Sequence, residues 1–154
     1  MLKRLRSLSP EERRDLPGAV WRLLVVRVCL AGLGIRRTRK LLSGGSKLDE
    51  ARTLPDLSPW NRRARALRRV ASRIPGTHCL ARSLALQWWM HRARIPARME
   101  IGVRSVNGAV ECHAWLEING APIDEEPGRV ATYTRLNWEK VTNRAAMGEV
   151  RWKG

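Results

Sequence analysis

The amino-acid sequence predicts an α+β fold in which helices pack against a small antiparallel sheet. Two observations predict it: residues 1–76 carry helix-type patterns, and residues 97–124 alternate apolar and polar residues between tight turns. Of the 154 residues, 44% are hydrophobic, which is enough to bury the core of one compact domain. Helices followed by consecutive antiparallel strands are typical of this class.

The first helix is expected to begin at Ser9, because Ser9 and Glu12 form a capping-box pattern around Pro10. Pro17-Gly18 is expected to interrupt this helix or to begin a new one. The next segment, residues 19–34, is helical in composition and is expected to end at Gly32 or Gly34.

Residues 42–59 are rich in Gly, Ser, Asp and Pro and are interpreted as a linker. Ser58-Pro59 is expected to cap a second helix over residues 60–74, with apolar residues on one stripe and arginines on another. We therefore divide the chain into a helical N-terminal region with its linker, residues 1–57, and a second unit, residues 58–154.

From Thr77 the pattern changes to one helix followed by strands. Asn-Gly is the strongest short signal for a hairpin turn, and it occurs twice in this half. The sequence predicts a helix over residues 77–95, strands over 97–105, 109–118 and 121–124, and a terminal helix over 138–147.

The net charge of +16 is concentrated in the first half of the chain. Residues 1–76 hold 19 Lys or Arg against 6 Asp or Glu, whereas residues 77–154 hold 11 against 8. A cationic half indicates an acidic partner, such as nucleic acid, anionic lipid or an acidic peptide. A high-GC genome that favours Arg over Lys explains the charge equally well. The apolar run 19–35 contains Arg22 and Arg27, so it is expected to pack against protein, with peripheral contact to a membrane as the alternative.

Neither a metal nor a cofactor is expected. The three cysteines show no CxxC spacing and no accompanying pair of histidines, which argues against a disulfide framework or a zinc site. The sequence also contains no phosphate-binding loop. Its charged N-terminus lacks the apolar stretch of a secretory signal, so we expect a cytoplasmic protein with reduced thiols.

Cys79 is the candidate nucleophile, because it lies in the first turn of its predicted helix, where the helix dipole favours a thiolate. The alternative is a small buried hydrophobe, as most free cysteines are. The backbone N–H of Cys79 is the natural first oxyanion donor, and Gln87 is expected to lie too far along the helix to be a second. His78 and His91 are weaker candidate bases, and Cys112 is expected in the core.

His113 is the candidate base, and Asp124 is the carboxylate expected to orient it. With a two-residue Asn-Gly turn, Trp115 lies opposite Asp124, and His113 shares the face of Trp115. The same alternation places Glu125 on the opposite face, and a one-residue slip would exchange the two carboxylates. Nucleophile, base and orienting carboxylate together form a catalytic triad.

The segment from Pro75 to Pro127 resembles the transglutaminase-like peptidases that mature lasso peptides. The shared pattern is a Cys after a Pro-Gly turn, Ile-Pro-Ala-Arg before a strand, and His-Ala-Trp-x-Glu-x-x-Gly before an acidic residue. These motifs cover about a third of the chain. They correspond to Cys79, residues 95–98, residues 113–115, Glu117, Gly120 and Asp124. The resemblance implies a papain-like cysteine protease core in residues 58–154, with Cys79 on a helix and His113 and Asp124 on adjacent strands.

The resemblance also implies a function, which is removal of the leader from a ribosomally made lasso peptide precursor by amide hydrolysis. Some members of that family fuse a leader-binding domain ahead of the protease, but residues 1–76 are predicted to be helical instead. The chain therefore resembles a stand-alone protease that acts with a discrete leader-recognition protein. The macrolactam-forming synthetase is a further expected partner, and the cationic first half is a candidate docking surface.

Two other functions fit parts of the sequence. A transglutaminase-like acyltransferase would use the same three residues with an amine as acceptor. A basic nucleic-acid-binding protein would explain the charge and the Arg-rich helix. However, no nucleic-acid-binding motif is present and aromatic residues do not alternate with the arginines, so nucleic acid is not expected as a partner.

Overall fold

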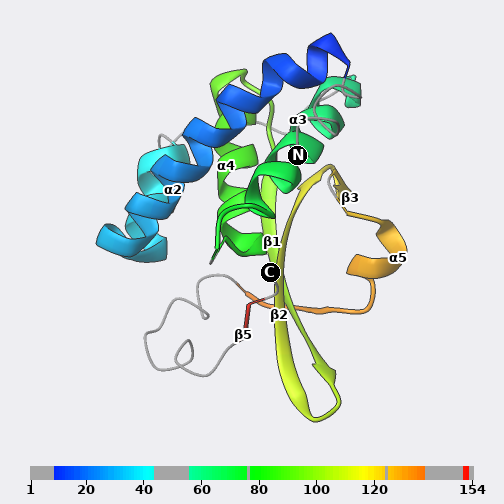
Figure 1. Ribbon diagram of the computed structural model, residues 1–154. Coiled ribbons are helices and arrows are strands. Elements are labelled where there is room, and N and C mark those ends of the chain that lie inside the picture. The colour runs from blue at the N-terminus through cyan, green and yellow to red at the C-terminus, as the bar shows by residue number, and fades with distance from the viewer. Residues whose placement is uncertain (1–8, 44–55, 76, 124, 138–150, 153–154) are drawn as a thin grey trace.

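The computed structural model confirms the α+β class (Figure 1). It describes residues 9–43, 56–75, 77–123, 125–137 and 151–152. Helices α2, α3 and α4 form one layer, and a long β-hairpin runs beside them and extends past their ends (Figure 1). The predicted terminal helix over 138–147 and most of the linker over 42–59 lie outside the described residues.

Helix α2 (Pro10–Ser43) begins as the capping box predicts. The backbone N–H of Ser9 donates to Glu12 Oε2 at 3.1 Å, and the N–H of Glu12 donates to Ser9 Oγ at 3.2 Å. The expected interruption at Pro17-Gly18 is wrong, because the helix continues through it. Proline removes one main-chain hydrogen bond, and we attribute the continuation to packing of α2 against α3 and α4.

A kink at Gly34 divides α2. Gly34 has φ 71° and ψ 173°, a left-handed φ that glycine adopts at little cost. The predicted helix end at this glycine is therefore confirmed as a break, but helical structure resumes and continues to Ser43.

Several arginines of helix α3 (Ser58–Ala71) form ion pairs with α2. Arg62 Nε lies 2.7 Å from Asp15 Oδ2, and Arg63 Nε lies 3.5 Å from Asp15 Oδ1. Arg69 Nη1 lies 2.9 Å from Glu12 Oε1. The acidic residues near the start of α2 thus pair with α3. The N-cap of α3 is Leu57, so the predicted capping role of Ser58 is wrong.

The sheet has strand order β3-β2-β1-β4, and all of these pairs are antiparallel. Its strands are β1 (Arg98–Val106), β2 (Ala109–Ile118), β3 (Ala121–Pro122) and β4 (Thr134–Arg135), and β5 (Arg151–Trp152) pairs with β2 in parallel. Both predicted Asn-Gly turns are confirmed. Each has positive φ at both central residues, 51° and 79° in the first turn and 49° and 79° in the second.

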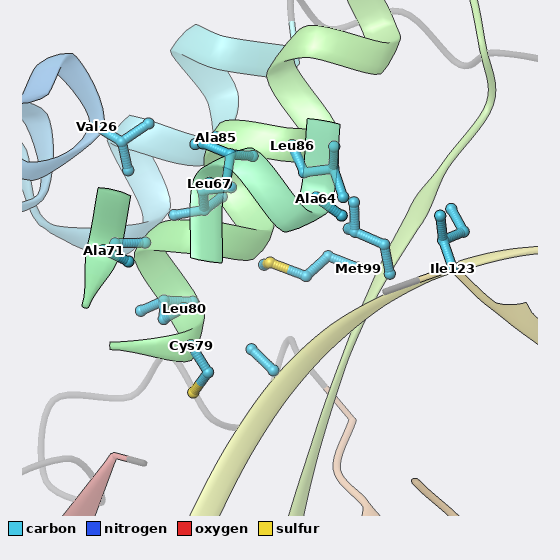
Figure 2. Packing of buried hydrophobic residues seen from close by; sticks show 14 of the residues in the cluster. Val26, Ala64, Leu67, Ala71, Cys79, Leu80, Ala85, Leu86, Met99 and Ile123 are labelled. Atoms are coloured by element: carbon cyan, nitrogen blue, oxygen red, sulfur yellow. The ribbon is translucent and has the colours of Figure 1, made fainter. Parts of the chain in front are cut away.

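One apolar core joins the helices to the sheet (Figure 2). Ala19, Leu23 and Val26 of α2 are fully buried in it with residues of α3, α4 and β2. Helix α4 (Cys79–Arg92) lies between α2 and the sheet, and its own residues are buried along most of its length. The core therefore includes residues on both sides of the predicted boundary at 57/58, which stays a prediction.

Candidate active site

Helix α4 lies against the edge of β2 that faces away from β1. Ser83 Oγ donates to the carbonyl of Ala114 at 3.0 Å, and Cys79 Sγ lies 4.0 Å from the carbonyl of Cys112. Carbonyls of alternate residues on a strand point to the same edge. These contacts hold the first turn of α4 beside the part of β2 that carries His113.

Cys79 is the first residue of α4, as the sequence predicts. The preceding residue, His78, is extended and exposed and forms the N-cap, so the first N–H groups of the helix surround Cys79. The Cys79 side chain is fully buried. Its sulfur lies at the margin of the apolar cluster and points away from Leu80 and Leu67 (Figure 2).

His113 is also fully buried, and its imidazole packs against two aromatic rings that also contact each other. Its centroid lies 6.1 Å from Trp115 and 5.3 Å from Tyr133. His113 Nε2 lies 3.2 Å from Glu125 Oε1. Neither ring nitrogen makes a well-aligned hydrogen bond within the described part of the chain, which is common in catalytic groups before substrate binds.

The surroundings of His113 favour its charged form. Burial alone would lower the pKa of His113, but interactions with Cys79 and Glu125 outweigh burial and raise the pKa to about 9. The sulfur and the carboxylate thus act on the same imidazole.

Glu125 contacts three cationic or ionisable groups. Besides His113, Arg129 Nη1 lies 3.2 Å from Glu125 Oε2, and Arg82 Nη2 lies 3.9 Å from Oε1. Burial alone would raise the pKa of Glu125, but His113 and Arg129 outweigh burial, and the pKa is lowered. Glu125 is therefore favoured as a carboxylate, although its side chain is only 5% exposed.

The expectation that Glu125 lies on the face away from His113 is wrong. The two-residue turn is confirmed, but β3 ends at Pro122, so strand alternation does not extend to Glu125 three residues later. Pro127 at the start of α5 (Pro127–Val130) is the signal that could have shortened the strand. Asp124, the carboxylate predicted from alternation, lies outside the described residues.

The family comparison agrees with this geometry. A family model described as the transglutaminase-like superfamily matches residues 20–137. The chain belongs to the transglutaminase-like superfamily. Comparison with curated proteins and with solved structures gives no match. Membership in the superfamily implies cysteine-dependent hydrolase or transferase chemistry, and it confirms the predicted papain- or transglutaminase-like core.

Other candidate residues have structural roles in this transglutaminase-like core. Cys112 is buried in the core as predicted, and burial together with Cys79 raises its pKa to about 12, so it is a thiol at neutral pH. Gln87 Nε2 donates to the carbonyl of Ala97 at 2.9 Å, and His91 Nε2 lies 3.3 Å from the same oxygen. No group of three or more potential metal ligands occurs among the residues that the structure describes.

The sequence predicts Trp115 on the strand face of His113, but it does not predict the other members of the aromatic and charged cluster there. Trp115 Nε1 donates to Glu117 Oε1 at 2.8 Å, and both oxygens of Glu117 accept from Arg135, at 2.8 and 3.0 Å. Gly102 makes room for the rings, because a Cβ there would lie 2.7 Å from Tyr133 Cβ and 2.9 Å from Trp115 Cη2. Tyr133 precedes a two-residue strand with no sequence pattern, so its position could not be predicted.

Proposed function

We propose that this protein is a cysteine peptidase that removes the leader from a lasso peptide precursor, acting with a separate leader-recognition protein. The observation that carries the proposal is the position of His113. Its buried imidazole lies 3.2 Å from Glu125, and Cys79 at the N-terminus of α4 packs against the adjacent carbonyl of β2. Superfamily membership supports the cysteine-dependent chemistry. The leader specificity rests on the sequence motifs between Pro75 and Pro127.

In the proposed mechanism His113 holds the proton that Cys79 gives up, so that a thiolate faces the imidazolium. Nε2 of His113 faces Glu125, which leaves Nδ1 for the thiol. The thiolate attacks the scissile carbonyl, and the backbone N–H of Cys79 stabilises the oxyanion. The core-peptide amine leaves with the proton from His113 and leaves a thioester between the leader and Cys79. Water, deprotonated by His113, hydrolyses this thioester and releases the leader acid and the free thiol.

The electrostatics favour the protonated imidazole of His113 at rest. With a pKa of about 9, His113 carries its proton at neutral pH. We propose Glu125 as the carboxylate that orients and stabilises the imidazolium, and Asp124 stays a prediction for the same role. Cys79 and His113 are both buried, so a peptide must displace neighbouring groups to reach the sulfur.

Mass spectrometry of a precursor peptide tests the proposal. The full-length protein is incubated with a precursor and a leader-recognition protein encoded beside it in the genome. We expect separate leader and core masses that together exceed the precursor by one water. Cys79→Ala should abolish both products, and Cys29→Ala is the matched control that should preserve them. Cleavage that persists in Cys79→Ala would refute the assignment.

Acyl transfer is the second candidate, because the superfamily includes it as a reaction class. The same incubation with a primary amine distinguishes the two reactions. Transfer gives a leader amide that carries the mass of the amine, whereas hydrolysis gives the free acid.

Nucleic-acid binding is less favoured by the structure. Arg62 and Arg69 form ion pairs with acidic residues of α2, which reduces the positive charge that α3 presents to a nucleic acid.

A further inference from the structure

Helix α2 presents an apolar stripe to the outside of the molecule. The stripe consists of residues three or four apart, which share one face of a helix. We call it the outer stripe, and its members are Pro17, Val20, Trp21, Leu24, Val28 and Ala31, all of them exposed. Figure 1 shows α2 on the outside of the helical layer, so no described element covers the stripe.

The exposure of the outer stripe is large for apolar residues. Trp21 is 63% exposed and Val28 is 72% exposed. In contrast, Ala19, Leu23 and Val26 on the inner face are fully buried against the other helices. Among the described helices, only α2 is long and apolar enough to cross a membrane. Within its most apolar 18-residue window, 17% of the residues are buried in the protein. Because its inner face is packed, α2 can lie flat on a surface but cannot span one without unpacking.

Basic residues lie at both ends of the outer stripe. Arg14 precedes it, and Arg36, Arg37 and Lys40 follow it, all of them exposed. Between residues 13 and 43 the only acidic residue is Asp15, which is buried and paired with α3. From residue 13 to residue 42, α2 therefore exposes apolar side chains and positive charge but no negative charge.

We propose that the outer stripe of α2 binds the surface of an anionic membrane. Exposed apolar side chains with an aromatic residue, flanked by arginines and lysines, are the features that insert into an anionic lipid surface. This proposal is independent of the chemistry of Cys79.

A second copy of the chain fits the outer stripe poorly. In a parallel pair of α2 helices, the basic residues at each end would lie beside the same residues of the second copy. In an antiparallel pair, Arg14 would face Arg36 and Arg37 of the second copy. Both arrangements place like charges together, which is unfavourable. An anionic bilayer places negative charge at both ends of the stripe at once.

Vesicle flotation with the full-length protein tests the proposal. One set of vesicles contains phosphatidylcholine alone, and the other contains phosphatidylcholine with phosphatidylglycerol. We expect flotation with the anionic vesicles only. The double variant Trp21→Ser/Val28→Ser should weaken binding by about tenfold or more, because these side chains lose the apolar contact. Arg36→Gln/Arg37→Gln should weaken it roughly tenfold. Val110→Ser is the matched control and should bind as wild type, because Val110 is 52% exposed on β2 and lies outside α2.

Three results would overturn the proposal. The first is no flotation with either vesicle, and the second is flotation that the Trp21→Ser/Val28→Ser variant does not weaken. The third is a dimer in light scattering that the same variant converts to a monomer, which would assign the stripe to a second copy. Far-UV circular dichroism confirms that each variant is folded before binding is compared.

Discussion

The two faces of β2 are both covered, but they differ in chemistry. One face contributes Cys112, Ala114, Leu116 and Ile118 to the apolar core shared with the helices. The other face carries Glu111, His113, Trp115 and Glu117 and is covered by Val130 of α5 and by the side chains of Tyr133, Glu125 and Arg135. His113 and Leu116 are equally buried, with 0% exposure each.

A buried strand face can carry charge when each charged group has a partner. A buried ionised group is costly unless a partner compensates it. Glu117 accepts from Trp115 and Arg135, and His113 faces Glu125. Residues on the apolar face contribute to stability through close packing alone. On the polar face, the neighbouring groups determine the protonation state of His113 and Glu125.

Removing the imidazole should give the largest effect. His113→Gln should lower kcat/KM for precursor cleavage by at least about a thousandfold, because both proton transfers lose their carrier. Kinetics with the leader-recognition protein present measure the loss. The variant His91→Gln is the control for a histidine outside the site, and activity of His113→Gln within tenfold of wild type would contradict the assignment.

Replacing the carboxylate should have the next largest effect. Glu125→Gln should lower kcat/KM by about a hundredfold, since the imidazolium loses its charged partner. If Glu125 orients His113, Asp124→Asn should change kcat/KM by less than about tenfold. The opposite order of the two variants in the same assay would assign the orienting role to Asp124.

A change on the apolar face should affect stability instead of rate. Leu116→Ala should lower the free energy of unfolding by about 2–5 kcal/mol, because it leaves a cavity in the core. Denaturant titration measures this loss, and the rate per folded molecule should stay within about twofold of wild type. Val110→Ala, at an exposed position of β2, should change stability by less than about 0.5 kcal/mol. A large loss of rate in folded Leu116→Ala would show that the two faces are not separable.

The smallest effect is expected within the aromatic cluster. Trp115→Phe removes the N–H that donates to Glu117 but keeps an aromatic ring beside His113. The loss should be about 1–2 kcal/mol in unfolding free energy, because Glu117 retains Arg135. Denaturant titration measures it, and Glu117→Gln in the Trp115→Phe background should then cost less than in wild type. Equal costs would mean that the hydrogen bond contributes nothing.

Much of the fold was predictable because its signals are local. The capping box at Ser9, the two Asn-Gly turns and the position of Cys79 at a helix start all follow from neighbouring residues. The carboxylate beside His113 was not, since it depends on where β3 ends and how the chain then turns into α5. Pro17 was misjudged for a similar reason, as tertiary packing overrides its local preference.

Measuring the pKa of His113 shows whether one imidazole interacts with both Cys79 and Glu125. The chain has three histidines, so NMR resonances can be assigned by substitution. Because the pKa of His113 in the folded protein is raised above 6.5, protonated His113 stabilises the folded state. This stabilisation is fully present below pH 6.5 and is lost as the pH rises through about 9. The proposed arrangement predicts a titration midpoint near 9 in wild type, with lower midpoints in Cys79→Ala and Glu125→Gln. A midpoint near 6.5 that neither substitution moves would contradict it.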